Sequence, residues 1–243
     1  MEQMRLDKFL SGCGACTRTE AKRVIRGGGV TVNGVVARAA EQKIDPERDT
    51  VTFCGKPLVY RKYTYILLNK PQGVVSATED GRDRTVLDLL PAEVRKAGLF
   101  PCGRLDKNTL GLMLITDNGE LAHKLLAPRS HVEKDYRFES KFPISEADAA
   151  RFEAGVTLED GYETKPARIR LEGSGDRGTI TLVEGKYHQI KRMLEALDNK
   201  ITYLERIRFG PLRLDPRMER GAWRYLTEEE VSALEAHGAG SAK

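Results

Sequence analysis

The sequence is poor in cysteine and proline and has no long apolar run, and each shortage excludes a class of protein. Its 243 residues include four cysteines, Cys13, Cys16, Cys54 and Cys102, spaced too irregularly for a disulfide framework or a zinc site. Ten prolines without a low-complexity tract exclude a disordered or fibrous chain. No stretch reaches the roughly 18 apolar residues of a membrane span, and early charges argue against a signal peptide. We expect a globular cytoplasmic protein that binds neither metal nor membrane.

Positive charge is concentrated in the first quarter of the chain. Residues 1–62 hold twelve Lys and Arg against seven Asp and Glu, whereas the remainder holds 28 against 29. The chain is also longer than a typical single domain. Such an asymmetry suggests a basic module for nucleic acid, joined to a domain of different purpose. We therefore predict two domains, at residues 1–60 and 61–243.

The basic part predicts two helices and a hairpin. Leu6, Phe9 and Leu10 repeat at helical spacing, and Thr17 and Glu20 have the spacing of a capping box before a second helix. Three glycines at 27–29 end that helix, and Asn33-Gly34 between β-branched runs predicts a tight hairpin turn. Solvated helix faces often carry charge, so the basic residues alone leave their role open. On the second helix these are Arg18, Lys22, Arg23 and Arg26.

After a predicted linker at 57–63, the chain alternates short strands and short helices. A helix after residue 116 is expected to be capped by Asp117, with Glu120 three positions later. Because hairpins and helices join most of the strands, we expect an α+β fold with a mixed, mostly antiparallel sheet. The other expected elements are strands at 63–69, 112–116, 134–141, 167–171 and 179–183, and helices at 145–154, 188–197 and 227–236.

One carboxylate stands in a basic loop ahead of an apolar strand. In the segment 103–112, Asp106 lies between Arg104 and Lys107. Aspartate is a common turn and capping residue, so the segment alone favours a structural role without excluding catalysis.

Two groups of motifs resemble known families. Residues 4–50, which open with Met-Arg-Leu-Asp-Lys-Phe-Leu, resemble the S4-type RNA-binding domain. Residues 66–211 resemble the pseudouridine synthases, with five motifs in the family's order. The Tyr187-His188 pair and the segment 164–167 are similar to the RsuA branch that modifies small-subunit ribosomal RNA. The five motifs are 69–75, 103–112 with its Gly-Arg-Leu-Asp, 134–136 with its Lys-x-Tyr, 184–193 and 204–211.

The resemblance implies an isomerase that needs no cofactor and converts a uridine of 16S ribosomal RNA, uridine 516, to pseudouridine. Asp106 would act on the flipped nucleotide, either by covalent addition or by removing a ribose proton. Lys191 would orient Asp106, and Tyr136 would stack on the detached uracil. We expect no catalytic role for His188, which has no evident partner in the sequence. The expected pocket residues are Arg104, Leu105, Thr109, Ile190, Arg192 and Leu204, and the expected RNA contacts are Arg5, Lys8, Arg18, Lys22, Arg23, Arg26, Lys70 and Lys107.

Two alternatives remain at this stage. One is a synthase of the same family that acts on 23S RNA, and the other is a non-catalytic ribosomal-RNA-binding or ribosome-assembly factor. The joint presence of Asp106, Tyr136 and Lys191 favours an enzyme, because a binding protein has little need of all three. The expected partner is ribosomal RNA, within the small subunit or its assembly intermediate, bound by a monomer.

Overall fold

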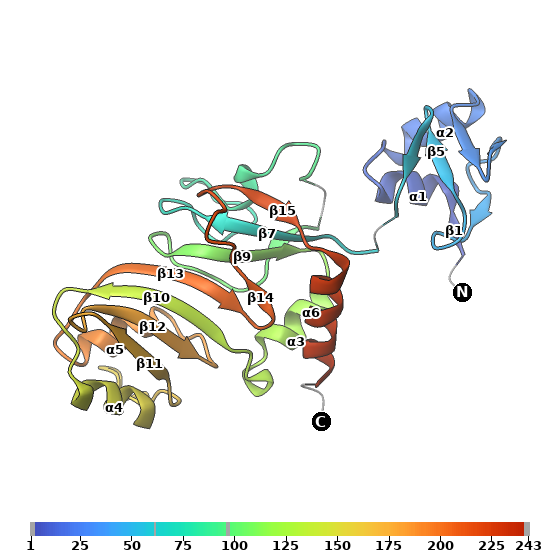
Figure 1. Ribbon diagram of the computed structural model, residues 1–243. Helices are drawn as coiled ribbons and strands as arrows, with labels where there is room; N and C mark the ends of the chain where they lie inside the picture. Colours follow the sequence, from blue (N-terminus) through green and yellow to red (C-terminus); the bar gives the residue numbers. More distant parts are fainter. Residues whose placement is uncertain (1–2, 61, 96–97, 241–243) are drawn as a thin grey trace. The chain divides into compact units, whose positions relative to one another are not determined.

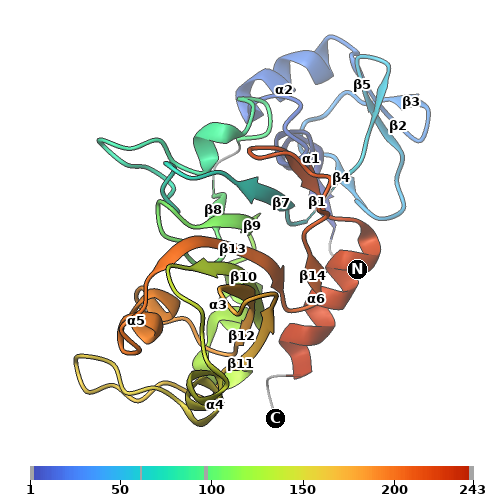
Figure 2. The ribbon, with the colours of Figure 1, turned by 60° about the vertical axis from the view of Figure 1, so that its left-hand side comes forward.

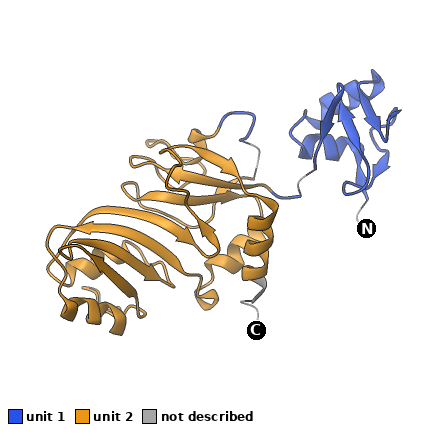
Figure 3. Cartoon of the chain, in the orientation of Figure 1, with its two compact units in different colours: residues 1–63, 91–97 blue, residues 64–90, 98–243 orange. Residues whose placement is uncertain are grey.

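The computed structural model describes residues 3–60, 62–95 and 98–240, and the chain divides into two compact units (Figures 1 and 3). The first unit comprises Met1–Tyr63 with Pro91–Ala97, and the second comprises Thr64–Leu90 with Gly98–Lys243. Among the described residues, no helix is long and apolar enough to cross a membrane.

The first unit packs two helices on a small antiparallel sheet of strand order β3-β2-β5-β6. The capping box of Thr17 and Glu20 begins the second helix as predicted. Positive φ angles at Asn33 and Gly34 confirm the predicted hairpin turn. The predicted linker at 57–63 begins too early, because its first residues lie in β6. The elements are β1 (Met4–Arg5), α1 (Leu6–Gly12), α2 (Arg18–Arg26), β2 (Val30–Val32), β3 (Val35–Val36), β4 (Lys43–Ile44), β5 (Val51–Phe53) and β6 (Lys56–Leu58).

The second unit is built on a nine-stranded sheet with the order β11-β12-β10-β13-β9-β7-β15, to which β14 adds at β13 and β8 at β9. Neighbouring strands are antiparallel except β13 and β9, which are parallel, so the predicted mixed, mostly antiparallel sheet is confirmed. The strands are β7 (Tyr65–Lys70), β8 (Phe100–Pro101), β9 (Leu110–Thr116), β10 (Lys134–Ser140), β11 (Arg168–Glu172), β12 (Arg177–Leu182), β13 (Ile201–Phe209), β14 (Leu212–Arg213) and β15 (Trp223–Tyr225).

The helices of this unit lie where the sequence predicts them. Helix α4 packs against β11, α5 against β13, and α3 against α6 (Figure 2). The predicted cap of α3 is wrong, because Asn118 rather than Asp117 accepts the N–H of Leu121. The Asp117 carboxylate accepts the N–H of Thr64 instead. The helices are α3 (Gly119–Leu126), α4 (Glu146–Ala154), α5 (Gln189–Glu195) and α6 (Glu228–Gly240), with 3-10 turns η1 (Leu87–Leu89) and η2 (Pro128–Ser130).

The parallel contact between β9 and β13 depends on a glycine. Gly111 pairs with Arg206 and has a φ of 99°, and a Cβ on it would collide with the backbone of Arg206. Any side chain at position 111 would push the two strands apart. The Arg206 side chain lies in the core, where its Nε donates to the Leu112 carbonyl.

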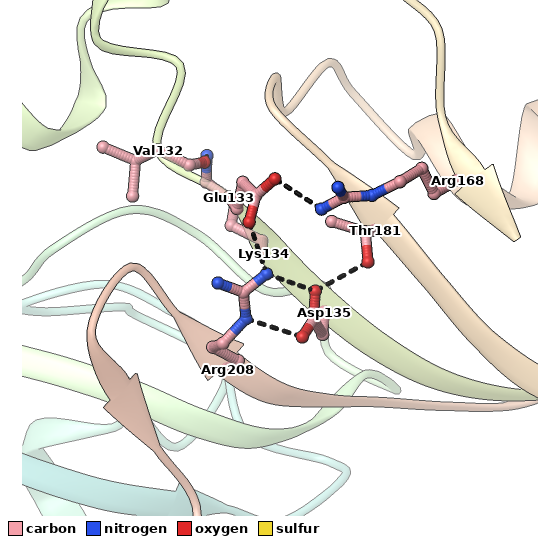
Figure 4. Close-up of polar contacts among 7 residues, drawn as sticks. All are labelled: Val132, Glu133, Lys134, Asp135, Arg168, Thr181 and Arg208. Carbon is pink, nitrogen blue, oxygen red and sulfur yellow. Dashed lines mark hydrogen bonds and ion pairs between the residues drawn. The ribbon is translucent and has the colours of Figure 1, made fainter. Parts of the chain in front are cut away.

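An ionic network fixes the position of β10 on the sheet (Figure 4). Arg208 of β13 donates through Nε and Nη2 to both oxygens of Asp135, at 2.6 and 2.8 Å, and through Nη2 to Glu133. Thr181 of β12 also donates to Asp135, and Arg168 of β11 pairs with Glu133. Four strands are therefore tied together at residues that directly precede Tyr136.

Candidate active site

The side chains singled out in the sequence meet in one pocket of the second unit. Its lining includes Asp106, Tyr136 and Lys191. Of the six expected pocket residues, the lining contains Arg104, Leu105, Thr109, Ile190 and Leu204. These residues come from the loop before β9, from β10, from α5 and from β13, so the pocket depends on the packing of elements that are distant in the sequence.

Asp106 lines this pocket, and its carboxylate lies between the side-chain nitrogens of Lys191 and His188. Its Oδ2 is 2.7 Å from Nζ of Lys191, and its Oδ1 is 3.5 Å from Nε2 of His188. The Asp106 side chain is 28% exposed, so one face of the carboxylate stays open to a ligand. The arrangement presents an oriented carboxylate to whatever enters the pocket.

A buried lysine holds the loop that carries Asp106. Lys70 is fully buried, and its Nζ donates to the carbonyls of Asp106, Lys107 and Thr109 and of Pro71, at 2.9 to 3.3 Å. Burial lowers the pKa of Lys70 to about 8. The expected phosphate contact by Lys70 is therefore wrong, because no part of its side chain reaches the surface.

A serine that sequence reasoning missed also holds this loop. Ser76 Oγ accepts the N–H of Leu105 and donates to the carbonyl of the same residue, at 3.0 and 2.7 Å. A serine six residues after a strand has no pattern that predicts such a contact. Its only signal is its position next to the motif at 69–75.

The pocket walls are aromatic and aliphatic, with one unpaired hydroxyl. Tyr136 is 8% exposed and lies on β10, where the register against β13 shifts between Asp135 and Tyr136. Such an irregularity changes the direction in which the following side chains point. Thr109 Oγ1 is buried and has no hydrogen-bond partner among the described residues.

Arg192 does not lie in the pocket where the resemblance had placed it. Its Nη2 is 2.6 Å from a carboxylate oxygen of Asp160, and it is absent from the pocket lining. Lys191 and Arg192 are adjacent on α5, so only one of them faces Asp106. Lys191 is that residue.

The expected RNA contacts other than Lys70 lie at the surface. In the first unit, Arg5 pairs with Asp7 at 2.9 Å and remains half exposed. In the second unit, Lys107 pairs with Asp83 at 2.7 Å beside the exposed Arg104. The remaining exposed residues, all of the first unit, are Lys8, Arg18, Lys22, Arg23 and Arg26.

His188 lies closer to the chemistry than the sequence indicated. It lines the pocket, has a left-handed backbone with φ of 49°, and faces Asp106. The sequence showed no partner for it, because Asp106 is 82 positions away along the chain. Within the part of the chain that the structure describes, no cluster of three or more His, Cys, Asp or Glu could hold a metal ion.

Both units of the chain are similar to known protein families. The family model for RNA pseudouridylate synthase matches residues 64–196, and the S4 domain model matches residues 4–50. A solved crystal structure of a pseudouridylate synthase has a TM-score of 0.67 and 34% identity, covering 95% of this chain and 99% of that one.

Relatives of similar length match almost the whole chain. An uncharacterized RNA pseudouridine synthase of Bacillus subtilis is 45% identical, covering 95% of this chain and 98% of the relative. The ribosomal small subunit pseudouridine synthase A of Vibrio cholerae is 42% identical, and that of Escherichia coli is 40% identical. Each of these covers 95% of this chain, and 99% and 100% of the respective relative.

The chain belongs to the RNA pseudouridylate synthases, which are isomerases that act on RNA, and it carries an S4 domain at its N-terminal end. Within that class it is a member of the RsuA family.

Proposed function

We propose that this enzyme converts one uridine of small-subunit ribosomal RNA to pseudouridine in the bacterial cytoplasm, with uridine 516 as its target. The small-subunit synthases of Vibrio cholerae and Escherichia coli, which match nearly end to end, support the choice of RNA. The observation that carries the proposal is the meeting of Asp106, Lys191 and Tyr136 at one pocket. A non-catalytic RNA-binding protein would not need an oriented carboxylate there.

The reaction needs little more than an oriented carboxylate and a pocket for a detached base. The bond between ribose C1′ and uracil N1 breaks, the uracil turns, and C5 bonds to C1′. C5 then loses its proton and N1 gains one, so the atoms balance. The product is an isomer of the substrate, so no oxidant or reductant is consumed. Asp106 either adds to the nucleotide covalently or takes a ribose proton, and both routes require it as a carboxylate. Lys191 holds it in position through the 2.7 Å ion pair.

The pocket walls retain the uracil between cleavage and rejoining. We assign Tyr136 the role of stacking on the base, since an aromatic ring binds a flat base and still lets it turn. Leu105, Ile190 and Leu204 exclude water from the other sides.

To enter the pocket, the uridine must leave its stack in the RNA. Flipping costs a few kcal/mol, and contacts to the rest of the RNA offset that cost. Arg104 and Lys107 would bind phosphates beside the pocket, and the S4 domain would add a second, tethered contact area.

Mapping pseudouridine on both ribosomal RNAs tests this proposal. Unmodified transcripts of the small- and large-subunit RNAs are incubated with the wild-type enzyme, and modified positions are read by sequencing. We expect one modified position, uridine 516 of the small-subunit RNA. If only the large-subunit RNA were modified, the proposed target would be wrong, and the enzyme would act on large-subunit RNA instead.

A substitution at Asp106 tests its assigned role. Release of tritium from RNA labelled at uridine C5 is measured for Asp106→Asn, which keeps the size of the side chain. We expect release to fall to background, while Asp215→Asn, at a carboxylate paired with Arg217, keeps the wild-type rate. Release that survives in Asp106→Asn would refute its role, and no release by the wild-type enzyme on either RNA would favour a non-catalytic protein.

A further inference from the structure

An aromatic pair, Tyr187 and His188, lies next to Asp106, and of the two only His188 lines the uridine pocket. The Tyr187 side chain is 70% exposed and does not line that pocket. Its ring lies parallel to the His188 ring, with centroids 3.9 Å apart and an interplanar angle of 17°. Burial of Tyr187 therefore contributes little to the fold, and one face of an ordered aromatic stack is left to solvent.

The backbone of His188 aims this stack at the reaction centre. His188 has φ 49° and ψ 32°, a left-handed conformation that is uncommon outside glycine and is kept where the surroundings require it. Its imidazole Nε2 faces Asp106 Oδ1 at 3.5 Å, while the ring itself packs on Tyr187. The stack thus extends from the Asp106 carboxylate toward solvent.

A cleft of about 520 Å³ runs alongside the stack. Tyr187 and His188 line it together with residues 75–77, and it shares Arg104 and Asp106 with the uridine pocket. A nucleotide chain with its uridine in the pocket would therefore extend into this cleft.

Two acids, Asp80 and Asp106, and two bases, Arg104 and Lys107, line the cleft. The Oδ1 of Asp80 accepts the N–H groups of Arg82 and Asp83. The Asp83 carboxylate pairs with Lys107. The exposed guanidinium of Arg104 then remains to meet a phosphate.

We propose that the Tyr187–His188 stack binds the base of the nucleotide directly adjacent to the target uridine. This inference rests on the proposed binding of the flipped uridine at Asp106. Extruding a base leaves its neighbour without a stacking partner, and an exposed ring beside the pocket replaces that partner. Any base can stack on an aromatic face, so the Tyr187–His188 stack stabilises the flipped state whatever the identity of the adjacent base.

The test is a set of Tyr187 variants assayed on a transcript that carries the uridine modified by the wild-type enzyme. We expect Tyr187→Ala to raise the Kd for this RNA roughly 5- to 150-fold, the range of one base–aromatic stack. Tyr187→Phe and Tyr187→Trp retain a flat ring and should bind within about 3-fold of wild type. The matched control is Phe142→Ala, which removes a half-exposed ring away from both the pocket and the cleft and should leave Kd unchanged.

Paired substitutions in protein and RNA identify the base. Each neighbour of the target uridine is replaced in turn by an abasic nucleotide. At one of the two positions, the abasic change should weaken binding to wild type but not to Tyr187→Ala. The proposal would be overturned if wild type and Tyr187→Ala bound this RNA with equal Kd values. It would also be overturned if, at both positions, the abasic nucleotide weakened binding to Tyr187→Ala as much as binding to wild type. Those outcomes leave the proposed function intact, since it fails only if the wild-type enzyme forms no pseudouridine or forms it only in the large-subunit RNA.

Discussion

Lys191 Nζ lies 2.7 Å from Asp106 Oδ2, although the two residues are 85 positions apart in the chain. The contact joins the first turn of α5 to the loop before β9. Both side chains are a little over a quarter exposed, so a ligand can reach the carboxylate without breaking the pair. The Asp106 carboxylate is thus oriented before any RNA binds.

Removing the charge at position 191 should slow the reaction more than it weakens RNA binding. For Lys191→Met we expect a roughly 10- to 100-fold lower single-turnover rate at saturating RNA, the equivalent of one charge-assisted hydrogen bond of about 1.5–3 kcal/mol. Lys191→Arg keeps the charge and should retain a larger part of the rate. The rate is followed by tritium release from C5-labelled RNA.

The control for this substitution is Lys200→Met, which removes an exposed lysine outside the pocket lining. It should react at the wild-type rate. An unchanged rate for Lys191→Met would show that the ion pair with Asp106 has no part in catalysis.

Lys70 should be important for stability rather than for RNA binding. Lys70→Met leaves the carbonyls of Pro71, Asp106, Lys107 and Thr109 without their shared donor, and we expect the free energy of unfolding to fall by about 2–4 kcal/mol. Denaturant titration measures this change. Lys107→Met, at an exposed lysine of the same loop, should leave stability within about 0.5 kcal/mol of wild type. Equal stabilities of the two variants would contradict the role assigned to Lys70.

Gly111 should not tolerate even a methyl group. Gly111→Ala places a Cβ against the Arg206 backbone at a positive φ, so we expect a loss of at least about 1–3 kcal/mol of stability. Thermal unfolding measures the loss. Gly119→Ala is the matched control, because a Cβ there meets nothing within 4 Å and φ is not positive. A Gly111→Ala protein as stable as Gly119→Ala would show that β9 and β13 can separate at no cost.

Elements with local signals could be predicted from the sequence. The capping box at Thr17 and Glu20 and the Asn33-Gly34 turn involve residues close in the chain, and both are confirmed. Strand β13 was not predicted, because charged residues at 205, 206 and 208 interrupt its apolar pattern. Their partners are supplied by other strands and by Arg220, which pairs with Glu205.

In the site, the predictions that failed depend on contacts between distant residues. Lys70 at the end of a strand resembles a surface lysine, and three of the four carbonyls that accept from it lie 36 to 39 positions later in the chain. Asp160 draws Arg192 away from the pocket, and Asp106 gives His188 a partner. The motif resemblance could locate Asp106, Tyr136 and Lys191, but it could not show which neighbouring charges are already paired.

Acid should weaken the network that fixes β10. Burial by itself would raise the pKa of Asp135, but hydrogen bonds from Arg208 and Thr181 outweigh it and hold that pKa below its usual 3.8. The folded state therefore binds fewer protons than the unfolded state near pH 3.8. The stability contributed by Asp135 is fully present above that pH and is lost as the pH falls through the lowered value.

Asp135→Asn tests this linkage by chemical denaturation across pH. At pH 7 we expect the free energy of unfolding of Asp135→Asn to be about 1–3 kcal/mol below that of wild type. The difference should shrink below pH 3.8, because protonated Asp135 and Asn carry the same charge. For Asp198→Asn, at an exposed aspartate, the free energy of unfolding should change with pH in the same way as for wild type. A deficit for Asp135→Asn that is constant at every pH would show that its charge is not what stabilises β10.

The basic face of α2 should set the salt dependence of RNA binding without affecting the chemical step. Replacing its four exposed basic residues by Gln should raise the Kd and reduce the steepness of log K against log salt. The reduction is roughly 0.7–0.9 for each phosphate that is no longer neutralised, or up to about 3.6 for four. The single-turnover rate at saturating RNA should stay at the wild-type value, because no residue of α2 lines the pocket around Asp106. The residues are Arg18, Lys22, Arg23 and Arg26.

A matched variant separates this effect from the loss of net charge. It carries Gln at four exposed basic residues of the second unit, outside both the pocket and the adjoining cleft: Lys141, Arg151, Arg177 and Lys200. The α2 variant should lose more affinity and more salt dependence than this one, since only α2 is expected to contact phosphates. If both variants lost equal affinity and salt dependence, α2 would contribute only through its net charge. A large fall in the single-turnover rate of the α2 variant would mean that the S4 domain takes part in forming the active site.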